Sequence, residues 1–487
     1  MQKQPSLSIA LVPIILLIIL LGTNVWLFGD NTLSGSNQIT LLFSGAIAAF
    51  IGFFYGTPWE KMLNGAIKSI SSAMGALIIL LLIGSLAGTW MLSGIVPSMI
   101  YYGLEILHPK IFLFAACIVC AIVSLATGSS WSTVATLGIA MLGIGNALGV
   151  SEGITGGAII SGAYFGDKMS PLSDTTNLAP AMAGTDLITH IKYMTYTTIP
   201  SIAIALIAFL IIGLMSSPEA NQLEQIANMQ SALTNSYNIS WLTLIVPVVV
   251  IGMIVKKVPA IPALLIGTLL GGLYAIIFQP DLINHLNASD NPSLLSYLKN
   301  SYTSVMNAMT VNVSVNTGDL AVNELVSTSG MSGMLNTIWL IICAMSFGGI
   351  MEATGLLKRI TSSLMNFVKS RKSLVLTTSS TCIFLNLTAS DQYLSIVVPG
   401  RMFADSYKKY NLHPKNLSRT LEDSATVTSV LVPWNTCGAT QAGVLGVATI
   451  TYLPYCFFNL LSPIMTLIFS YASIKIAKLK STNETSN

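Results

Sequence analysis

Runs of apolar residues recur along the whole 487-residue sequence, and ten of them are 14 to 26 residues long. They cover residues 9–28, 39–55, 70–92, 111–126, 194–215, 242–255, 261–278, 335–351, 374–387 and 452–477. A helix needs about 20 mostly apolar residues to cross a bilayer. Only 8% of the residues are charged, where a soluble domain has about 25%. We therefore expect an all-α polytopic membrane protein with about 10–13 membrane segments, counting short and broken ones.

One polar stretch interrupts this apolar pattern. Residues 166–177 read Gly-Asp-Lys-Met-Ser-Pro-Leu-Ser-Asp-Thr-Thr-Asn and include three charged residues and a proline. A charged side chain at the middle of a bilayer costs about 2.5–3.5 kcal/mol on insertion scales. Such a cluster is tolerated where it faces protein partners, water or a bound ion, so we expect the functional site here.

The sequence also indicates an internal repeat. The pairs Ser93-Gly94 and Thr354-Gly355 precede similar segments, which end in Thr-Gly-Ser-Ser at 127–130 and Thr-Ala-Ser-Asp at 388–391. Both correspondences have an offset of 261 residues (355 − 94 and 388 − 127). A second polar break, at Asp167 and Asp423, follows at an offset of 423 − 167 = 256. Chance similarity of small residues, which are common in membrane helices, is the alternative explanation.

Basic residues predict how the two halves are oriented. Residues 369–372, 401–419 and 475–480 are rich in lysine and arginine and should be cytoplasmic. Segment 373–400 would then enter and leave on one side as a re-entrant hairpin, and its counterpart at 111–145 would enter from the outside. We expect two inverted repeats, each with a re-entrant hairpin and a broken helix, as in secondary transporters.

This pattern divides the chain into regions. Residues 1–215 would form an N-terminal membrane region containing the first repeat, and residues 216–240 a polar external linker. Residues 241–487 would form a C-terminal membrane region containing the second repeat and a polar external segment at 279–330. The net charge of +3 is dispersed, so the expected environment is the lipid bilayer and no nucleic-acid partner is indicated.

The polar breaks supply oxygen ligands. Within a helix Pro171 would free the carbonyl group of Asp167, and a freed carbonyl must find a donor or a cation. Carboxylate, hydroxyl and amide oxygens suit a small hard cation such as Na⁺. Two alternatives stay open: Pro171 could be only a kink, and Asp391 could only cap the hairpin turn.

Other residue types do not indicate a second chemistry. Cys117 and Cys120 have the spacing of a metal pair but lie in an apolar run without histidine, so we interpret them as core residues. No histidine–carboxylate cluster or nucleophile with a nearby base is apparent, so neither an enzyme nor a cofactor is expected. A channel is disfavoured by the near-symmetrical halves.

Several motifs closely resemble the NhaC family of sodium/proton antiporters, within the ion transporter superfamily. They lie at residues 161–180, 184–187, 389–393, 399–401, 417–423 and 432–438, and the resemblance spans nearly the whole chain. It implies a multi-pass exchanger of the bacterial plasma membrane with scaffold and transport parts, an elevator-like motion and a role in pH homeostasis. It is also compatible with a homodimer.

The family label also covers proteins that resemble malate/lactate exchangers, so a Na⁺/H⁺-coupled organic-acid exchanger is the alternative. A dicarboxylate would require a cluster of arginines. Arg401 and Arg419 lie in or beside a basic loop, where positive-inside placement explains them. We therefore favour Na⁺ and H⁺ as the transported ions.

The resulting hypothesis is exchange at shared carboxylates. Burial favours the protonated form of a carboxylate, so Na⁺ and H⁺ would compete for the same oxygens. We expect Na⁺ at Asp174, Asn177 and Asp391, with Asp174 as the shared ligand. The full predicted ion- and proton-binding set is Ser129, Ser130, Ser173, Asp174, Thr175, Thr176, Asn177, Ser390 and Asp391. The predicted supporting charge network is Asp167, Lys168, Glu422, Asp423 and Asn435, in which Lys168 reaches Glu422 or Asp423.

Overall fold

The computed structural model describes residues 5–28, 35–215, 222–287, 293–311 and 314–479. Within these residues seven helices are long and apolar enough to cross a membrane, or up to nine if two bent pairs each count as one span. The seven are α1 (Leu7–Phe28), α2 (Ser36–Phe54), α3 (Trp59–Leu92), α5 (Pro109–Thr127), α10 (Leu187–Met215), α13 (Ala260–Phe278) and the helix over Met331–Ala353 that includes α17 (Leu335–Ala353). The predicted all-α polytopic class is confirmed. Two shorter predicted segments, 242–255 and 374–387, form arms of helical hairpins.

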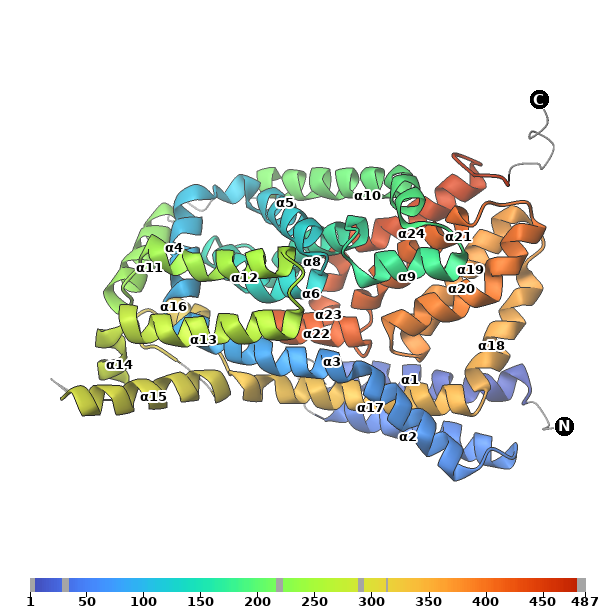
Figure 1. Cartoon of the computed structure of the whole chain (residues 1–487), viewed down its shortest axis with the longest axis horizontal. Helices are drawn as coiled ribbons and strands as arrows, with labels where there is room; N and C mark the ends of the chain where they lie inside the picture. Colours follow the sequence, from blue (N-terminus) through green and yellow to red (C-terminus); the bar gives the residue numbers. More distant parts are fainter. Residues whose placement is uncertain (1–4, 29–34, 216–221, 288–292, 312–313, 480–487) are drawn as a thin grey trace.

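The helices form two layers; in Figure 1, α10 lies along the upper edge of the molecule, and α2 and α17 lie along the lower edge. The scaffold layer contains α1, α2, α3, α13, α15 (Leu294–Thr310) and α17, in which α3 packs on α13, α15 and α17. The hairpin layer contains α5, α8 (Glu152–Met169), α9 (Asp174–Ala183), α10, α19 (Arg371–Thr388), α20 (Gln392–Lys409), α22 (Thr436–Leu445) and α24 (Phe457–Tyr471).

Glycines allow α5 and α8 to pack closely within the hairpin layer. A side chain at Gly162 would overlap the carbonyl oxygen of Cys117, and one at Gly166 would overlap that of Ala121. Small residues let membrane helices approach in this way, so that van der Waals contact can hold them together without a hydrophobic driving force. The packing holds the end of α8, with Asp167, against the first hairpin.

Two helical hairpins end inside the protein. The first runs through α5 to Gly128 and Ser129 and returns through α6 (Ser130–Thr133), a π-helical turn at Val134–Gly138 and α7 (Ile139–Ala147). The second runs through α19 to Ala389, Ser390 and Asp391 and returns through α20. We call Gly128–Ser129 and Ala389–Asp391 the hairpin tips. Both tips turn through left-handed backbone, at Gly128 (φ +70°) and Ser390 (φ +58°).

The two hairpins enter from opposite ends of the 29-residue helix α10. Gly213, near the end of α10, packs against the carbonyl group of Lys110 at the start of the first hairpin. Tyr193, near the start of α10, hydrogen-bonds the tail at Ala477, and the carbonyl of Ala477 accepts from the backbone of His413 just beyond the second hairpin. This arrangement agrees with the orientation expected from the sequence, while the inverted relation of the two complete halves stays a prediction.

The break predicted at Pro171 separates α8 from α9. Helix α8 ends at Met169, residues 170–173 form a turn, and α9 begins at Asp174. The hydroxyl of Thr176 donates to the backbone carbonyl oxygens of Asp167 (3.2 Å) and Lys168 (3.0 Å). The carbonyl groups at the break therefore have donors within the protein, the hydroxyl of Thr176 and the backbone N–H of Ser170. A second break lies before α22, where a π-helical turn at Glu422–Thr426 and a 3₁₀ turn at Ser429–Leu431 lead into extended backbone at Val432.

A buried ion pair joins these two broken regions. Lys168 pairs with Asp423, and both side chains are 0% exposed. Ser462 of α24 also accepts a hydrogen bond from Lys168 at 2.8 Å, and Thr197 of α10 donates one to Asp423 at 2.8 Å. Breaking such a pair leaves one uncompensated charge in the interior, which is costly. The pair therefore fixes the end of α8 relative to the second half of the chain.

Replacing Lys168 by methionine should lower the free energy of unfolding by about 3–5 kcal/mol, because Asp423 would stay buried without a counter-charge. The double variant Lys168→Met, Asp423→Asn removes both charges and should recover part of that loss. Unfolding of the detergent-purified protein measures both effects.

The control is Lys408→Met, because Lys408 and Asp405 form an exposed pair with side chains 61% and 88% accessible. Exposed pairs contribute little to stability. An unfolding transition in Lys168→Met that coincides with that of the control would contradict the structural role of the buried pair.

Candidate functional site

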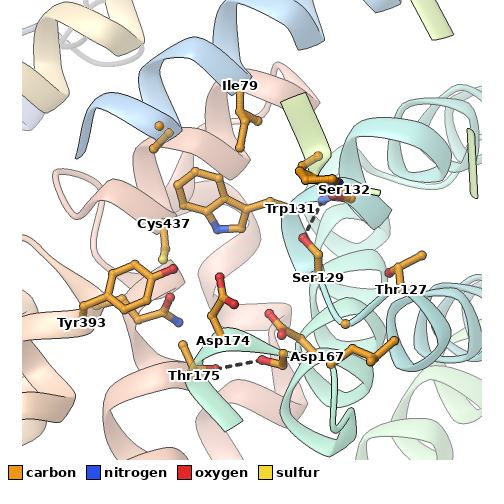
Figure 2. Close-up of a pocket in the computed structure, with 18 of the residues that line it drawn as sticks. Ile79, Thr127, Ser129, Trp131, Ser132, Asp167, Asp174, Thr175, Tyr393 and Cys437 are labelled. Carbon is orange, nitrogen blue, oxygen red and sulfur yellow. Dashed lines mark hydrogen bonds between the residues drawn. The ribbon is translucent and has the colours of Figure 1, made fainter. Parts of the chain in front are cut away.

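A cavity of about 780 Å³ lies between the two layers and contains three carboxylates, those of Asp167, Asp174 and Asp391. Figure 2 shows the carboxylates of Asp167 and Asp174 directed into the same space, with Ser129 on one side and Tyr393 and Cys437 on the other. Both polar breaks of the first half and the tip of the second hairpin thus meet in one place.

Each wall of the cavity comes from a different layer. The hairpin layer supplies both hairpin tips and the starts of α9 and α22, through Ser129, Asp391, Asp174 and Thr436. The opposite wall is the middle of α3, from Ser72 to Ile79, together with Ile254 near the end of α12 (Ile245–Val255) and residues 257–260, which lead into α13. A relative movement of the two layers would therefore change the shape and access of the cavity.

Asp167 is held in place by the first hairpin. Its Oδ2 accepts hydrogen bonds from the backbone N–H (3.1 Å) and the hydroxyl (2.7 Å) of Ser130. Ser130 does not line the cavity, whereas its neighbour Ser129 does. Ser130 therefore orients a carboxylate, and Ser129 presents its side chain to the cavity.

Asp174 and Asn177 lie at the start of α9. Both side chains are exposed within the cavity. The side-chain nitrogen of Asn177 donates to the backbone oxygens of Pro171 (3.0 Å) and Ser173 (2.7 Å), which leaves its side-chain oxygen as the available group. A carboxylate in the first turn is also favoured by the helix dipole. The start of α9 thus offers two oxygen-bearing groups to an ion.

Asp391 has a dual position. It caps α20 by accepting the backbone N–H of Leu394 at 2.8 Å, which is the capping geometry that the sequence left open. It also lines the cavity, although its side chain is only 6% exposed. The neighbouring Ser390 accepts the backbone N–H of Thr436 at 3.0 Å and so ties the hairpin tip to α22. A group that bound to Asp391 would therefore act directly on the start of α20 and, through Ser390, on the start of α22.

A fourth carboxylate, Glu422, lies behind the cavity wall. It is 0% exposed and accepts a hydrogen bond from the hydroxyl of Thr175 at 3.0 Å. Thr175 itself lines the cavity. The hydroxyl of Thr175 therefore links Glu422 to the cavity, while the adjacent Asp423 forms an ion pair with Lys168.

The predicted site residues fall into two groups. The residues that line the cavity are Ser129, Asp167, Ser173, Asp174, Thr175, Asn177 and Asp391. The others, which do not line it, are Ser130, Lys168, Thr176, Ser390, Glu422, Asp423 and Asn435. Asn435 caps α22 and donates to the backbone oxygen of Asn386 at 3.1 Å. The second group positions the first through hydrogen bonds and the buried ion pair.

The cavity carboxylates do not form a complete cation-binding site in this conformation. Among the described residues, no three His, Cys, Asp or Glu side chains lie close enough together to hold one metal ion. An ion would therefore bind through one or two carboxylates with amide, hydroxyl or water oxygens, or after the hairpin tips approach α9.

The sequence missed several cavity residues. They include Trp131, Ser132, Lys257, Gln392, Tyr393, Thr436 and Cys437. Lys257 could have been suspected, because two lysines follow an apolar segment of only 14 residues at 242–255. Arg419 needs a correction: it is 0% exposed, and its guanidinium carbon lies 4.6 Å from the centre of the Tyr193 ring. It is thus a buried residue of the hairpin layer rather than an ordinary loop residue.

Comparison with known proteins shows the family of this chain. The sequence pattern of the Na⁺/H⁺ antiporter family matches residues 162–474, which include the α8–α9 break and the second hairpin. The chain belongs to the Na⁺/H⁺ antiporter family. The family assignment agrees with the resemblance found in the sequence.

Three named relatives match most of the chain. The Na⁺/H⁺ antiporter NhaC of Alkalihalophilus pseudofirmus is 38% identical over 91% of this chain and 92% of its own length. The malate-2H⁺/Na⁺-lactate antiporter of Bacillus subtilis is 36% identical over 89% of both chains. The arginine/ornithine antiporter ArcD of Halobacterium salinarum is 35% identical over 98% of this chain and 94% of its own length. Together with the apolar helices, the bacterial relatives support a multi-pass protein of the bacterial plasma membrane.

A cysteine introduced at Gly75 should react with a water-soluble thiol reagent. Gly75 lines the cavity, and a Cβ there would meet no atom within 4 Å. Leu80→Cys is the control, because Leu80 lies on the same helix and is 0% exposed. The six native cysteines are all buried, and the wild type gives the background, including any reaction of Cys437 at the cavity wall. A mass shift on the intact protein reports the reaction; equal labelling at both positions would contradict the open cavity.

Proposed function

We propose that this chain is a secondary active transporter that exchanges Na⁺ for H⁺ by alternating access. The observation that carries the proposal is the meeting of Asp167, Asp174 and Asp391 in one cavity between two layers of helices. Relatives named as Na⁺/H⁺ antiporters support the same function. This function requires a transported ion and no resident cofactor.

Na⁺ suits the oxygen groups of the cavity. The proposed ligands are the carboxylates of Asp174 and Asp391 and the side-chain oxygen of Asn177, with hydroxyl groups such as that of Ser129 nearby. Hard oxygen ligands favour hard cations over transition metals. Binding would draw the tip of the second hairpin toward the start of α9, because the carboxylates belong to those two elements.

Competition between the two ions provides the exchange. A carboxylate removed from water is stabilised either by a bound cation or by a proton. A carrier with bare carboxylates would have to move negative charge through a low-dielectric region, which is costly. The hairpin layer would therefore move across the membrane only with Na⁺ or H⁺ bound. Na⁺ would be carried in one direction and H⁺ in the other.

The residues behind the cavity support this exchange. Ser130 orients Asp167, and Ser390 ties the tip of the second hairpin to α22. Thr175 connects the cavity to Glu422. We propose that Glu422 either orients the site or carries a second proton. The ion pair of Asp423 and Lys168 fixes the end of α8 relative to the second half of the chain.

A Na⁺/H⁺-coupled organic-acid exchanger is the second candidate, and the size of the cavity favours it. A volume of about 780 Å³ lies within the range of about 300–1,000 Å³ typical of pockets for organic ligands. Lys257 on the cavity wall could pair with a carboxylate of such a substrate. One relative is named as a malate/lactate antiporter.

Replacing Asp174 by asparagine should reduce Na⁺-dependent proton movement to the level of vesicles without the protein, because the shared carboxylate is lost. The measurement uses everted membrane vesicles and a pH-sensitive dye. Asp405→Asn is the matched control, since Asp405 is an exposed carboxylate on α20 outside the cavity. Near-normal exchange in folded Asp174→Asn protein would remove Asp174 from the mechanism.

The two candidate functions differ in what a Na⁺ gradient alone can do. With purified protein in liposomes, the favoured function predicts proton movement driven by Na⁺ without any organic acid. Addition of malate or lactate should leave the rate unchanged. Proton movement that appears only when one of these acids is present would establish the second candidate instead.

A further inference from the structure

Lys257 lies at the tip of the α12–α13 hairpin, near the middle of the protein. The α12–α13 hairpin has its base beside the end of α3, where Gln279 accepts from the backbone of Asn238 (2.9 Å) and donates to the carbonyl group of Ser93 (3.2 Å). Its tip lines the same cavity as Ser72 and Ile79, near the middle of the 34-residue helix α3. The lysine is thus placed at membrane depth, where charge is normally costly.

The backbone at Lys257 is unusual for this residue type. Lys257 has φ +66°, a left-handed conformation that residues with a Cβ adopt at an energetic cost. Its N–H donates to Ile254 (2.8 Å), and the N–H of Val258 donates to Met253 (3.0 Å). This closure of a helix end usually has glycine at the left-handed position. Packing does not explain the lysine, because its side chain is exposed in the cavity.

The charges around the cavity are divided between its two walls. Asp167, Asp174 and Asp391 belong to the hairpin layer, and Lys257 lines the same cavity from the α12–α13 tip. Lys257 is the one basic residue among those that line the cavity, and its side chain forms no ion pair among the described residues. The adjacent Lys256 does not line the cavity.

We propose that Lys257 is a tethered cation that competes with Na⁺ for the cavity carboxylates; this inference rests on the proposed Na⁺/H⁺ exchange. When no ion is bound, the ammonium group partly neutralises the carboxylates. Na⁺ must overcome this positive charge to bind. Lys257 therefore sets the apparent affinity for Na⁺ and holds the unloaded hairpin layer toward the scaffold side.

The test compares Na⁺ affinity in purified wild type, Lys257→Met, Lys257→Gly and Lys256→Met. Both Lys257 variants remove the charge; methionine keeps the bulk of the side chain, and glycine relieves the backbone conformation. Equilibrium binding of radioactive Na⁺ should give a dissociation constant about tenfold lower in both variants, as expected for removal of one nearby charge in a site of reduced dielectric. Lys256→Met should match the wild type, because its charge lies outside the cavity.

Three results would overturn the inference. An unchanged or weaker Na⁺ affinity in both Lys257 variants would do so, and so would an equal gain in Lys256→Met, which would indicate a general surface charge effect. A loss of malate- or lactate-dependent transport with unchanged Na⁺ binding would assign Lys257 to an organic anion instead.

Reconstituted wild type is assayed for exchange in parallel, so that the two levels of the argument separate. Suppose that the wild type exchanges Na⁺ for H⁺ and that the Lys257 variants have the same Na⁺ dissociation constant as the wild type. The proposed function then stands, and the role of Lys257 is refuted. If the wild type neither binds nor exchanges Na⁺, the proposed function fails, and the inference about Lys257 fails with it.

Discussion

The cost of placing charge inside a membrane determines how this protein is built. Charged groups at that depth must pair with each other or face water or a bound ion. The break between α8 and α9 meets this requirement twice within eight residues. Lys168 is neutralised by Asp423 in a fully buried pair. Asp167 and Asp174 line a cavity.

These two arrangements separate a carboxylate that is paired in the interior from carboxylates that line the cavity. The carboxylate of Asp423 receives Lys168 together with the hydroxyls of Thr197, Ser462 and Thr466. Such a group has little capacity left for an exchangeable ion. Asp174 and Asp391, by contrast, line the cavity. Because that cavity lies between the scaffold and hairpin layers, occupancy of the carboxylates and relative movement of the layers can be coupled.

The sequence indicated this candidate site because polar residues are conspicuous in an apolar chain. The stretch 166–177 and the tip at 388–391 were found by that contrast, and the structure brings Asp174 and Asp391 into one cavity. The direction of individual side chains could not be predicted. Ser129 and Ser130 are adjacent, yet one faces the cavity and the other orients Asp167. That difference depends on the left-handed turn at Gly128.

Basic residues were the weakest part of the sequence interpretation. Counting charge in loops placed Arg419 in or beside a cytoplasmic loop, but the helix over Lys415–Leu421 buries it against Tyr193. Lys257 resembled an ordinary loop residue between two spans, because a hairpin that turns back within the membrane has the same local composition. In both positions the packing of distant segments, rather than the local sequence, determines the environment of the charge.

The central claim is that Na⁺ and H⁺ compete for the same cavity carboxylates. Its most direct test is to titrate Na⁺ into purified protein in a weakly buffered solution and to measure the protons released. The account predicts proton release that saturates together with Na⁺ binding and is lost in Asp174→Asn. Saturable Na⁺ binding without any release of protons, at every pH tested, would contradict it.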